Sequence, residues 1–208
     1  MNLLRLAFLL IVLALPIQAK AQEATDLEGM PSGLYELDKN HASLIWKVSH
    51  LGLSNYTARF TDFDIDIDFN AFEPAASRVR ATIDPTSVET DFPEPEKKDF
   101  DKELAMKESW FNAEQFPQIT FMSTSVEKTG DNTGKVTGDL TFLGVTKPVT
   151  LDVVFNKAIG NHPFANKPAL GFSATTTIKR SDFGLTTYIP QIGDEVEIII
   201  EAEFFYAG

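Results

Sequence analysis

The chain of 208 residues contains no cysteine, which excludes disulfide bonds, thiolate nucleophiles, iron–sulfur clusters and cysteine-type zinc sites. Histidine is scarce as well, and no two of His41, His50 and His162 have the short helical spacing of a zinc protease. We therefore expect no metal site and no cofactor.

Positive charge is also scarce, with 18 lysines and arginines against 30 aspartates and glutamates and a formal net charge of −12. Such a surface repels phosphate backbones, so nucleic acid is not an expected partner. Catalytic motifs are missing too. Residues 171–175 lack the second glycine of a nucleophile elbow, and the sequence has no glycine-rich phosphate loop. We therefore expect a protein that is not an enzyme.

Long apolar runs are confined to the N-terminus. Arg5 precedes an apolar run over 6–15 that is too short to span a bilayer, and Ala19-Lys20-Ala21 provides a small-x-small cleavage site. We interpret this segment as a secretory signal peptide, so the protein is expected to be exported. The predicted organisation is 1–21 as signal peptide, 22–32 as a flexible N-terminal arm and 33–208 as one folded domain.

The chain is rich in alternating apolar and polar residues. Over 196–206, the residues at even positions are apolar, and three of those at odd positions are glutamates. This alternation predicts a strand with one apolar and one solvated face. The other alternating segments are 43–50, 77–84, 134–143, 147–157 and 169–178, with a less regular one at 118–126. Roughly eight such strands with short hairpin links predict an all-β fold, an extended antiparallel eight-stranded barrel.

The segment 56–69 predicts where the barrel bends. Its apolar residues lie at even positions up to Phe60 and at odd positions from Phe63, so the phase changes at Thr61-Asp62. We expect a β-bulge there, because a slip of one residue would turn the apolar face outward. The aspartates at 62, 64, 66 and 68 stand about 7 Å apart on a strand, too far apart for neighbours to share one small ion. We interpret them as a solvated outer face.

One stretch departs from the alternation. Residues 91–116 begin with Pro93-Glu94-Pro95 and then place Phe100, Leu104 and Phe111 on one side of a charged segment at helical spacing. We expect a short helical insertion between two strands. It forms either a plug over one end of the barrel or a lid that gates a cavity, and the sequence leaves both open.

Large apolar residues at inward parity mark the candidate ligand-binding wall. The predicted ligand-binding residues are Trp46, Val48, His50, Phe60, Phe121, Phe142, Phe155, Phe172, Arg180, Phe183, Ile198 and Ile200. The 17 phenylalanines are more than a tight small barrel needs, and apolar walls suit a long hydrocarbon tail. The alternative is that these rings fill a solid core.

A few polar residues are placed near a mouth of the barrel. Arg180 and Lys179 are suited to meet a phosphate or a quinone oxygen of a ligand headgroup. The alternative is that Arg180 pairs with Asp182 to brace a turn. His50 shares the inward parity of the wall and is interpreted either as a core histidine or as a headgroup contact.

Short motifs in a fixed order give the chain a resemblance to a known family. They are Asp38-Lys39-Asn40-His41-Ala42-Ser43, Val48-Ser49-His50-Leu51-Gly52, Ser87-Val88-Glu89-Thr90, Phe116-Pro117-Gln118-Ile119-Thr120-Phe121, Gly138-Asp139-Leu140-Thr141, Gly144-Val145-Thr146-Lys147-Pro148-Val149, Ile178-Lys179-Arg180-Ser181-Asp182-Phe183-Gly184 and Gly193-Asp194-Glu195-Val196. Over residues 33–206 this ordered set resembles the YceI-like, polyisoprenoid-binding family. Two positions depart from the family pattern: Leu104-Ala105 stands where many members carry a histidine, and Lys179 stands where asparagine is usual.

The resemblance implies a lipocalin-like barrel, export to the periplasm and an apolar tunnel for a long isoprenoid chain, such as a quinone tail or a polyprenyl phosphate. The expected function is that of a carrier or store for such a lipid. Two alternatives stay open: an enzyme or stress-response factor that acts on the lipid, and an interaction domain with a filled barrel that docks a membrane protein. Phe205 and Ile199, at outward parity, favour a homodimer contact or pack under the insertion.

Overall fold

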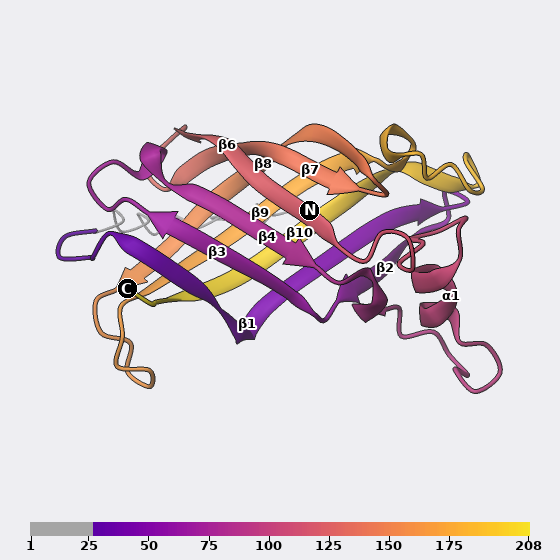
Figure 1. Ribbon diagram of the computed structural model, residues 1–208, viewed down its shortest axis with the longest axis horizontal. Coiled ribbons are helices and arrows are strands. Elements are labelled where there is room, and N and C mark those ends of the chain that lie inside the picture. The colour runs from indigo at the N-terminus through magenta and orange to yellow at the C-terminus, as the bar shows by residue number, and fades with distance from the viewer. Residues whose placement is uncertain (1–26) are drawn as a thin grey trace, which may run out of the picture.

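The computed structural model describes residues 27–208, which form a closed β-barrel with a short helix at one end (Figure 1). The predicted signal peptide, 1–21, and residues 22–26 of the predicted arm lie outside the described residues. The strands are β1 (Gly33–His50), β2 (Ser54–Phe60), β3 (Phe63–Phe69), β4 (Arg78–Ile83), β5 (Val88–Glu89), β6 (Ile119–Lys128), β7 (Thr133–Phe142), β8 (Val145–Ile159), β9 (Ala169–Lys179) and β10 (Ile192–Tyr206). Between 27 and 208 the helical elements are α1 (Phe100–Met106), η1 (Pro74–Ala76), η2 (Pro85–Ser87) and η3 (Arg180–Phe183).

Neighbouring strands run antiparallel, and the sheet closes where β10 pairs with β1. β2 and β3 are two halves of one long stretch, since β3 pairs with the first residues of β1 and β2 with its last. β4 and β5 divide in the same way, β4 lying on β3 and β5 on β2. Counted in this way, eight antiparallel strands close the barrel, which confirms the predicted fold class.

Two irregularities bend the longest strands. Residues 61 and 62 form a bend between β2 and β3, where the backbone N–H of Thr61 donates to the carbonyl of Ser87 at 3.1 Å. The register of β1 against β10 also shifts between Leu37 and Ala42. The irregularity predicted at Thr61-Asp62 is therefore confirmed, and such bends let long strands curve into a closed barrel.

The aspartates that follow this bend lie on the outside of the barrel. Asp62, Asp64 and Asp68 are exposed and Asp66 is half-buried. The Lys39 ammonium lies 3.2 Å from Asp64 and 3.8 Å from Asp62 on the outer surface. The solvated outer face predicted for these residues is confirmed.

Helix α1 and the segments on either side of it cover one end of the barrel, and we call residues 91–116 the cap (Figure 1). Asp99 caps the helix, since its side chain accepts a hydrogen bond from the backbone N–H of Lys102 at 3.0 Å. Leu104 points into the barrel and is buried. The predicted helical insertion is confirmed as one seven-residue helix. Within 27–208, no helix has the length and hydropathy needed to cross a bilayer.

Side-chain contacts tie the cap to the barrel at two places. The Asp101 carboxylate accepts hydrogen bonds from the backbone N–H and the hydroxyl of Thr90, at 3.0 and 2.5 Å, just after β5. On the other side, the Thr187 hydroxyl donates to the carbonyl of Ser109 at 2.7 Å and joins the cap to the loop before β10. The cap is thus held from both flanks.

Two buried clusters lie toward the two ends of the barrel. The cluster of the capped end consists of Val88, Leu104, Ala105, Phe111, Phe121, Val136, Leu140, Phe142, Phe183 and Leu185. The opposite end, where the β6–β7 turn lies, is called the hairpin end. Its cluster consists of Met30, Tyr35, Phe63, Ile65, Ile67, Phe69, Ile83, Leu170, Ala202 and Phe204. Of the predicted N-terminal arm, residues 27–32 are described, and there Met30 is buried in this second cluster.

Candidate functional site

Two adjoining cavities run through the inside of the barrel. The larger, of about 480 Å³, lies beneath the cap, and the smaller, of about 240 Å³, lies toward the hairpin end. Ile65, Val79, Leu151 and Ile200 line both cavities, which therefore meet at this ring of side chains. The two cavities therefore adjoin along the inside of the barrel, on either side of these four side chains.

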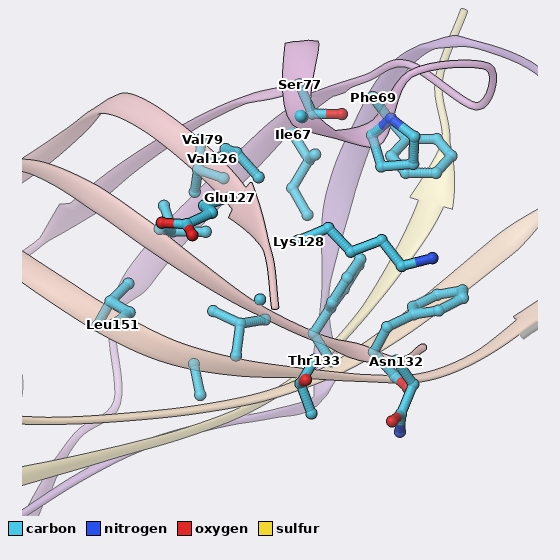
Figure 2. A pocket seen from close by; sticks show the side chains of 18 of the residues that line it. Ile67, Phe69, Ser77, Val79, Val126, Glu127, Lys128, Asn132, Thr133 and Leu151 are labelled. Carbon is cyan, nitrogen blue, oxygen red and sulfur yellow. The ribbon is translucent and has the colours of Figure 1, made fainter. Parts of the chain in front are cut away.

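The smaller cavity has an aliphatic and aromatic wall with a polar rim (Figure 2). Phe155 and Phe172, both among the predicted ligand-binding residues, line it with their ring centroids 5.1 Å apart. The polar side chains at its rim are Ser77, Glu127, Lys128, Asp131, Asn132 and Thr133. Several of these rim residues are exposed, so the cavity reaches the surface at the hairpin end.

The larger cavity collects most of the residues predicted from the sequence. Those that line it are Trp46, Val48, His50, Phe60, Phe121, Phe142, Arg180, Ile198 and Ile200. Phe183 lines neither cavity; it is buried behind the wall, with its ring centroid 5.8 Å from that of Phe142. The structure therefore brings the predicted wall together around a hollow, while ligand binding by these residues stays a prediction.

Polar groups are sparse in the larger cavity. Among the described residues no carboxylate lines it, and the charged or titratable side chains that do are His50, Tyr56, Lys98 and Arg180. His50 is exposed at the rim, which is not the environment of a core histidine. The cavity is consequently an apolar space without negative charge.

Arg180 is buried, and its side chain fixes the loop that leads into β10. Its guanidinium donates to the backbone carbonyls of Gly193 at 2.7 Å, Ile192 at 2.9 Å and Leu185 at 3.2 Å. Burial lowers the pKa of the guanidinium, against the opposing influence of the Asp194 charge. The predicted alternative of an Arg180–Asp182 brace is thus replaced by a brace onto backbone carbonyls.

A group of aromatic rings closes the capped end. The ring centroid of Phe111 lies 6.3 Å from that of Trp46 and 5.7 Å from that of Phe60. The ring of Phe100 lies 6.2 Å from that of Tyr56, in an edge-to-face arrangement. Rings of the cap therefore pack directly on the β1 and β2 wall of the larger cavity.

Sequence reasoning missed several wall residues at this end. They are Tyr56, Phe92, Phe100, Trp110 and Phe111, all of which line the larger cavity. Tyr56 has the even parity of Phe60 in the same strand, so extending the alternation to the start of the strand would have found it. The cap residues carried no such signal, because helical spacing shows which side is apolar but not which strands it covers.

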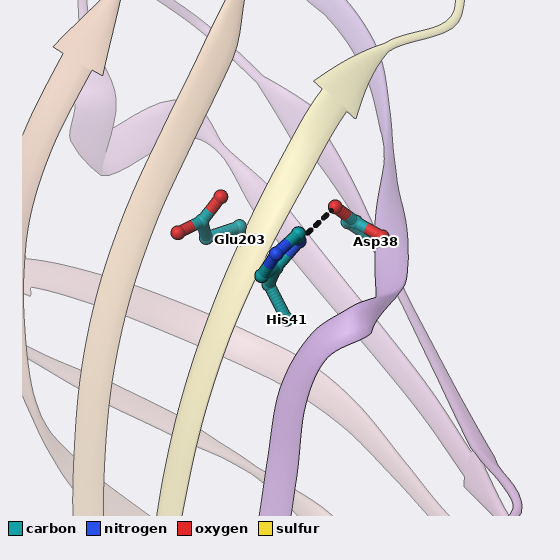
Figure 3. A group of neighbouring side chains, drawn as sticks. All are labelled: Asp38, His41 and Glu203. Carbon is teal, nitrogen blue, oxygen red and sulfur yellow. Dashed lines mark hydrogen bonds and ion pairs between the residues drawn. The ribbon is translucent and has the colours of Figure 1, made fainter. Parts of the chain in front are cut away.

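Outside the barrel, the structure places Asp38, His41 and Glu203 together (Figure 3), with one ligand-type atom from each all within 4.8 Å of one another. The Asp38 carboxylate lies 2.7 Å from His41 Nδ1 and accepts hydrogen bonds from the backbone and side chain of Asn40 at 3.0 and 3.1 Å. These contacts span the residues where β1 shifts register against β10, so they brace the bulge.

The electrostatics of this group follow from the same contacts. Burial raises the pKa of Asp38, but the hydrogen bonds from His41 and Asn40 outweigh it and lower that pKa below its ordinary value. The hydrogen bond to Asp38, together with its negative charge, raises the pKa of His41. Between the two pKa values the aspartate is charged and the histidine protonated, which favours their pairing.

Comparison with known proteins gives this barrel a family. Residues 35–204 match the YceI-like domain. Protein YceI of Salmonella arizonae is 42% identical over 171 residues, covering 81% of this chain and 85% of that protein. The chain belongs to the YceI-like family. Among solved structures similar to this YceI-like barrel, BcnA of Burkholderia cenocepacia has a TM-score of 0.68 and 25% identity, covering 80% of this chain and 98% of that one.

A polyisoprenoid-binding domain from Saccharophagus degradans shares the YceI-like fold, with a TM-score of 0.60 at 16% identity over 83% of this chain and 98% of that one. Three of the motifs that carried the family resemblance occupy irregular places in this barrel. Residues 38–43 form the β1 bulge, 87–90 include β5 and the anchor of the cap, and 180–184 form η3 with the Arg180 brace. Other motifs lie in regular strands of this YceI-like protein, such as 138–141 in β7, and Leu140 there lines the larger cavity.

Proposed function

We propose that the protein is an exported binding protein that holds an isoprenoid or other long-chain lipid, of the quinone or polyprenyl phosphate type, as a carrier or store. The observation that carries this proposal is the pair of adjoining apolar cavities along the inside of the barrel. A cavity of about 480 Å³ falls within the usual range of small-molecule sites, and the second cavity extends it for a long tail. Each buried methylene contributes about 0.8 kcal/mol, so a tail binds without strong polar contacts.

Incomplete burial of inward-facing residues supports a hollow barrel over a filled one. Trp46, Ile198 and Ile200 face the inside of the barrel, yet each is only half-buried. A filled core of this size would bury such side chains almost completely. The space left at these side chains is what a ligand tail would occupy.

Family and fold agree with this proposal. The chain is a YceI-like protein, and a domain of the same fold from Saccharophagus degradans is a polyisoprenoid-binding domain. Binding without chemical conversion fits a tunnel with no carboxylate among its described lining residues beneath the cap. Export to the periplasm through a signal peptide at 1–21 is part of the proposal, and fractionation of cells that express the full chain tests it.

Native mass spectrometry with organic extraction tests the proposal, on mature protein purified without detergent from its own compartment. We expect a co-purified lipid whose mass fits an isoprenoid series. A clean mass of the protein alone, with no uptake of added quinone or polyprenyl phosphate, would contradict the proposal and favour an interaction domain.

A variant that blocks the tunnel makes this test sharper. Ile200 lines both cavities, so Ile200→Trp should obstruct the passage between them and reduce uptake of long tails more than of short ones. Ile199→Trp is the matched control, because Ile199 is the neighbour on β10 whose side chain lies on the other face. Equal effects of the two variants would count against a tail that runs through the tunnel.

A further inference from the structure

Two phenylalanines at the hairpin end point almost entirely into solvent. Phe72 lies in the loop between β3 and β4 and is 94% exposed. Phe164 lies in the loop between β8 and β9 and is 89% exposed. A phenyl ring gains free energy wherever it leaves water, so both rings favour a partner that takes them out of it.

The loops hold both rings outward through hydrogen bonds of their own. In the first loop, the side-chain oxygen of Asn70 accepts a hydrogen bond from the backbone N–H of Phe72 at 3.0 Å. In the second, His162 accepts two, its carbonyl from the N–H of Asn166 at 2.8 Å and its Nδ1 from the N–H of Ala165 at 3.2 Å. Such side-chain and backbone bonds fix the shape of a turn. The exposure of the two rings is therefore a property of the folded loops.

The two loops stand on opposite sides of the barrel mouth. Around the closed barrel, β4, β6, β7 and β8 lie between them on one side, and β3, β1, β10 and β9 on the other (Figure 1). The rim of the smaller cavity between them is polar and includes Lys128, Asn132 and Thr133 (Figure 2). A protein interface has an apolar centre and a polar rim, which is the reverse of this arrangement. A lipid bilayer is a broad flat surface and reaches both rings at once.

Charge distinguishes the hairpin end from the capped end. Segments 27–32, 69–78, 127–133 and 157–168 of the hairpin end carry four acidic and four basic side chains, whereas the cap carries eight acidic and four basic ones. Anionic lipid headgroups repel a surface of net negative charge but not a balanced one. Exposed apolar residues also occur at the capped end, such as Leu53 at 83% exposure, but there the acidic cap opposes approach to a bilayer.

We propose that the hairpin end docks on the surface of a phospholipid bilayer, with Phe72 and Phe164 inserted among the headgroups on either side of the mouth. Phenylalanine is among the side chains that bury themselves at the boundary of headgroups and acyl chains. The polar rim between the rings then faces the headgroups, which offer it hydrogen-bond partners. Docking is reversible, because two rings bury little apolar area. It goes beyond the proposed function and needs no lipid inside the barrel.

Cosedimentation of the mature protein with phosphatidylcholine vesicles tests this docking surface. Phe72→Ser and Phe164→Ser should each weaken binding about tenfold. The double variant should weaken it about a hundredfold, because distant sites contribute independently. Leu53→Ser is the matched control, since it removes an exposed apolar side chain from the opposite end and should leave binding unchanged. All of these side chains are exposed, so thermal melting should stay the same in every variant.

A fluorescence measurement shows which end enters the bilayer. Phe72→Trp and Phe164→Trp should each shift their emission to shorter wavelength on vesicles and be quenched by brominated acyl chains. Leu53→Trp should do neither. The natural tryptophans, Trp46 and Trp110, are present in all three variants and give the same background.

The outcomes separate the docking surface from the proposed function. Equal vesicle binding by wild type and the double variant would overturn the docking surface, and so would binding that requires anionic lipid and disappears at high salt. A wild-type protein that yields an extracted lipid but does not bind vesicles would overturn docking and leave the proposed function in place. Vesicle binding by a protein with an empty barrel would do the reverse. Capture of one protein by wild type and not by the double variant, without vesicle binding, would overturn docking in favour of a protein partner.

Discussion

At the capped end, Phe100, Trp110 and Phe111 close over the larger cavity with their rings, whereas at the hairpin end exposed polar side chains surround the smaller one. The capped end is held by side chains that reach across from other elements, Arg180 and Asp101 above all. At the hairpin end, backbone pairing in the sheet and a buried cluster around Tyr35 do the holding. Both ends have a buried cluster, so the difference is that the capped end adds side-chain contacts between distant segments to its burial.

This difference has a consequence for dynamics and for ligand exchange. A segment that is held by a few hydrogen bonds and ring contacts can open locally, whereas a buried core in the sheet opens only when the whole domain unfolds. We therefore expect the cap, which lies outside the sheet, to open before the cluster that contains Tyr35 and Leu170. Substitutions at the two ends should consequently differ both in how much stability they remove and in whether they affect local or global unfolding.

Arg180→Leu should have the largest effect. It leaves the carbonyls of Leu185, Ile192 and Gly193 without their donor, and the free energy of unfolding should fall by about 3–5 kcal/mol. Urea denaturation measures the loss, and hydrogen exchange should show it first in residues 180–193. Arg80→Leu, on an exposed side chain of β4, is the control with little change. Equal losses in the two variants would show that the brace does not hold the capped end.

Leu170→Ala and Leu104→Ala compare the two ends directly. Both leucines are buried, at 1% and 4% exposure, so truncation leaves a cavity in each case. Leu170→Ala should lower the free energy of global unfolding by about 3 kcal/mol. Leu104→Ala should lower it less and instead raise the exchange of backbone amides in the cap. A uniform increase in exchange over the whole barrel in Leu104→Ala would contradict this division.

Gly138→Ala should cost about 1–3 kcal/mol by overpacking. A Cβ at Gly138 would collide with the ring of Phe121 and lie 2.5 Å from the carbonyl oxygen of Met122. Since Phe121 lines the larger cavity, the displaced ring should also reduce ligand uptake. Gly160→Ala is the control, because nothing lies within 4 Å of a Cβ there. Thermal melting of the two variants gives the comparison, and equal melting temperatures would refute it.

The barrel itself was predictable because its information is local. Alternation in β10 and the phase change at Thr61-Asp62 each depend on a few neighbouring residues. Because successive side chains of a strand point to opposite faces of the sheet, these patterns show directly which residues point inward. The wall residues of the strands, such as Trp46 and Ile198, followed from the same parity. The cavity inside the barrel could not be predicted from parity, because parity shows that a side chain points inward but not whether its neighbours fill the space.

The capped end was harder to predict because it depends on contacts between distant segments. Phe111 approaches Trp46 and Phe60 across about fifty residues or more of chain, and no local pattern encodes that meeting. The partners of Arg180 are backbone carbonyls. Every residue carries one, so the sequence favoured the nearby charged residue Asp182 as the partner instead. The sequence shows the type of each side chain, whereas only the fold shows which backbone atoms it reaches.

The smallest expected effect is a pH dependence at the Asp38–His41 pair, where β1 bends between the two ends. The raised pKa of His41 adds stability that is complete below about pH 6.5 and is lost as the pH rises through the pKa in the folded protein. The lowered pKa of Asp38 adds stability that is present above about pH 4 and is lost as the pH falls through the folded pKa. The pair should therefore stabilise the bulge most between about pH 4 and 6.5.

His41→Asn should remove the part of this dependence that comes from His41 and leave the part that Asn40 gives to Asp38. The difference in urea midpoint between wild type and variant should be largest near the middle of that window and shrink at alkaline pH, where His41 is neutral. A chelator in all samples keeps stray metal ions away from Asp38, His41 and Glu203, whose ligand-type atoms lie within 4.8 Å of one another. A difference that stays constant across the pH range would show that His41 acts through its shape rather than its charge. In that case the bend would depend on pH only through the Asp38 carboxylate, which accepts hydrogen bonds from Asn40.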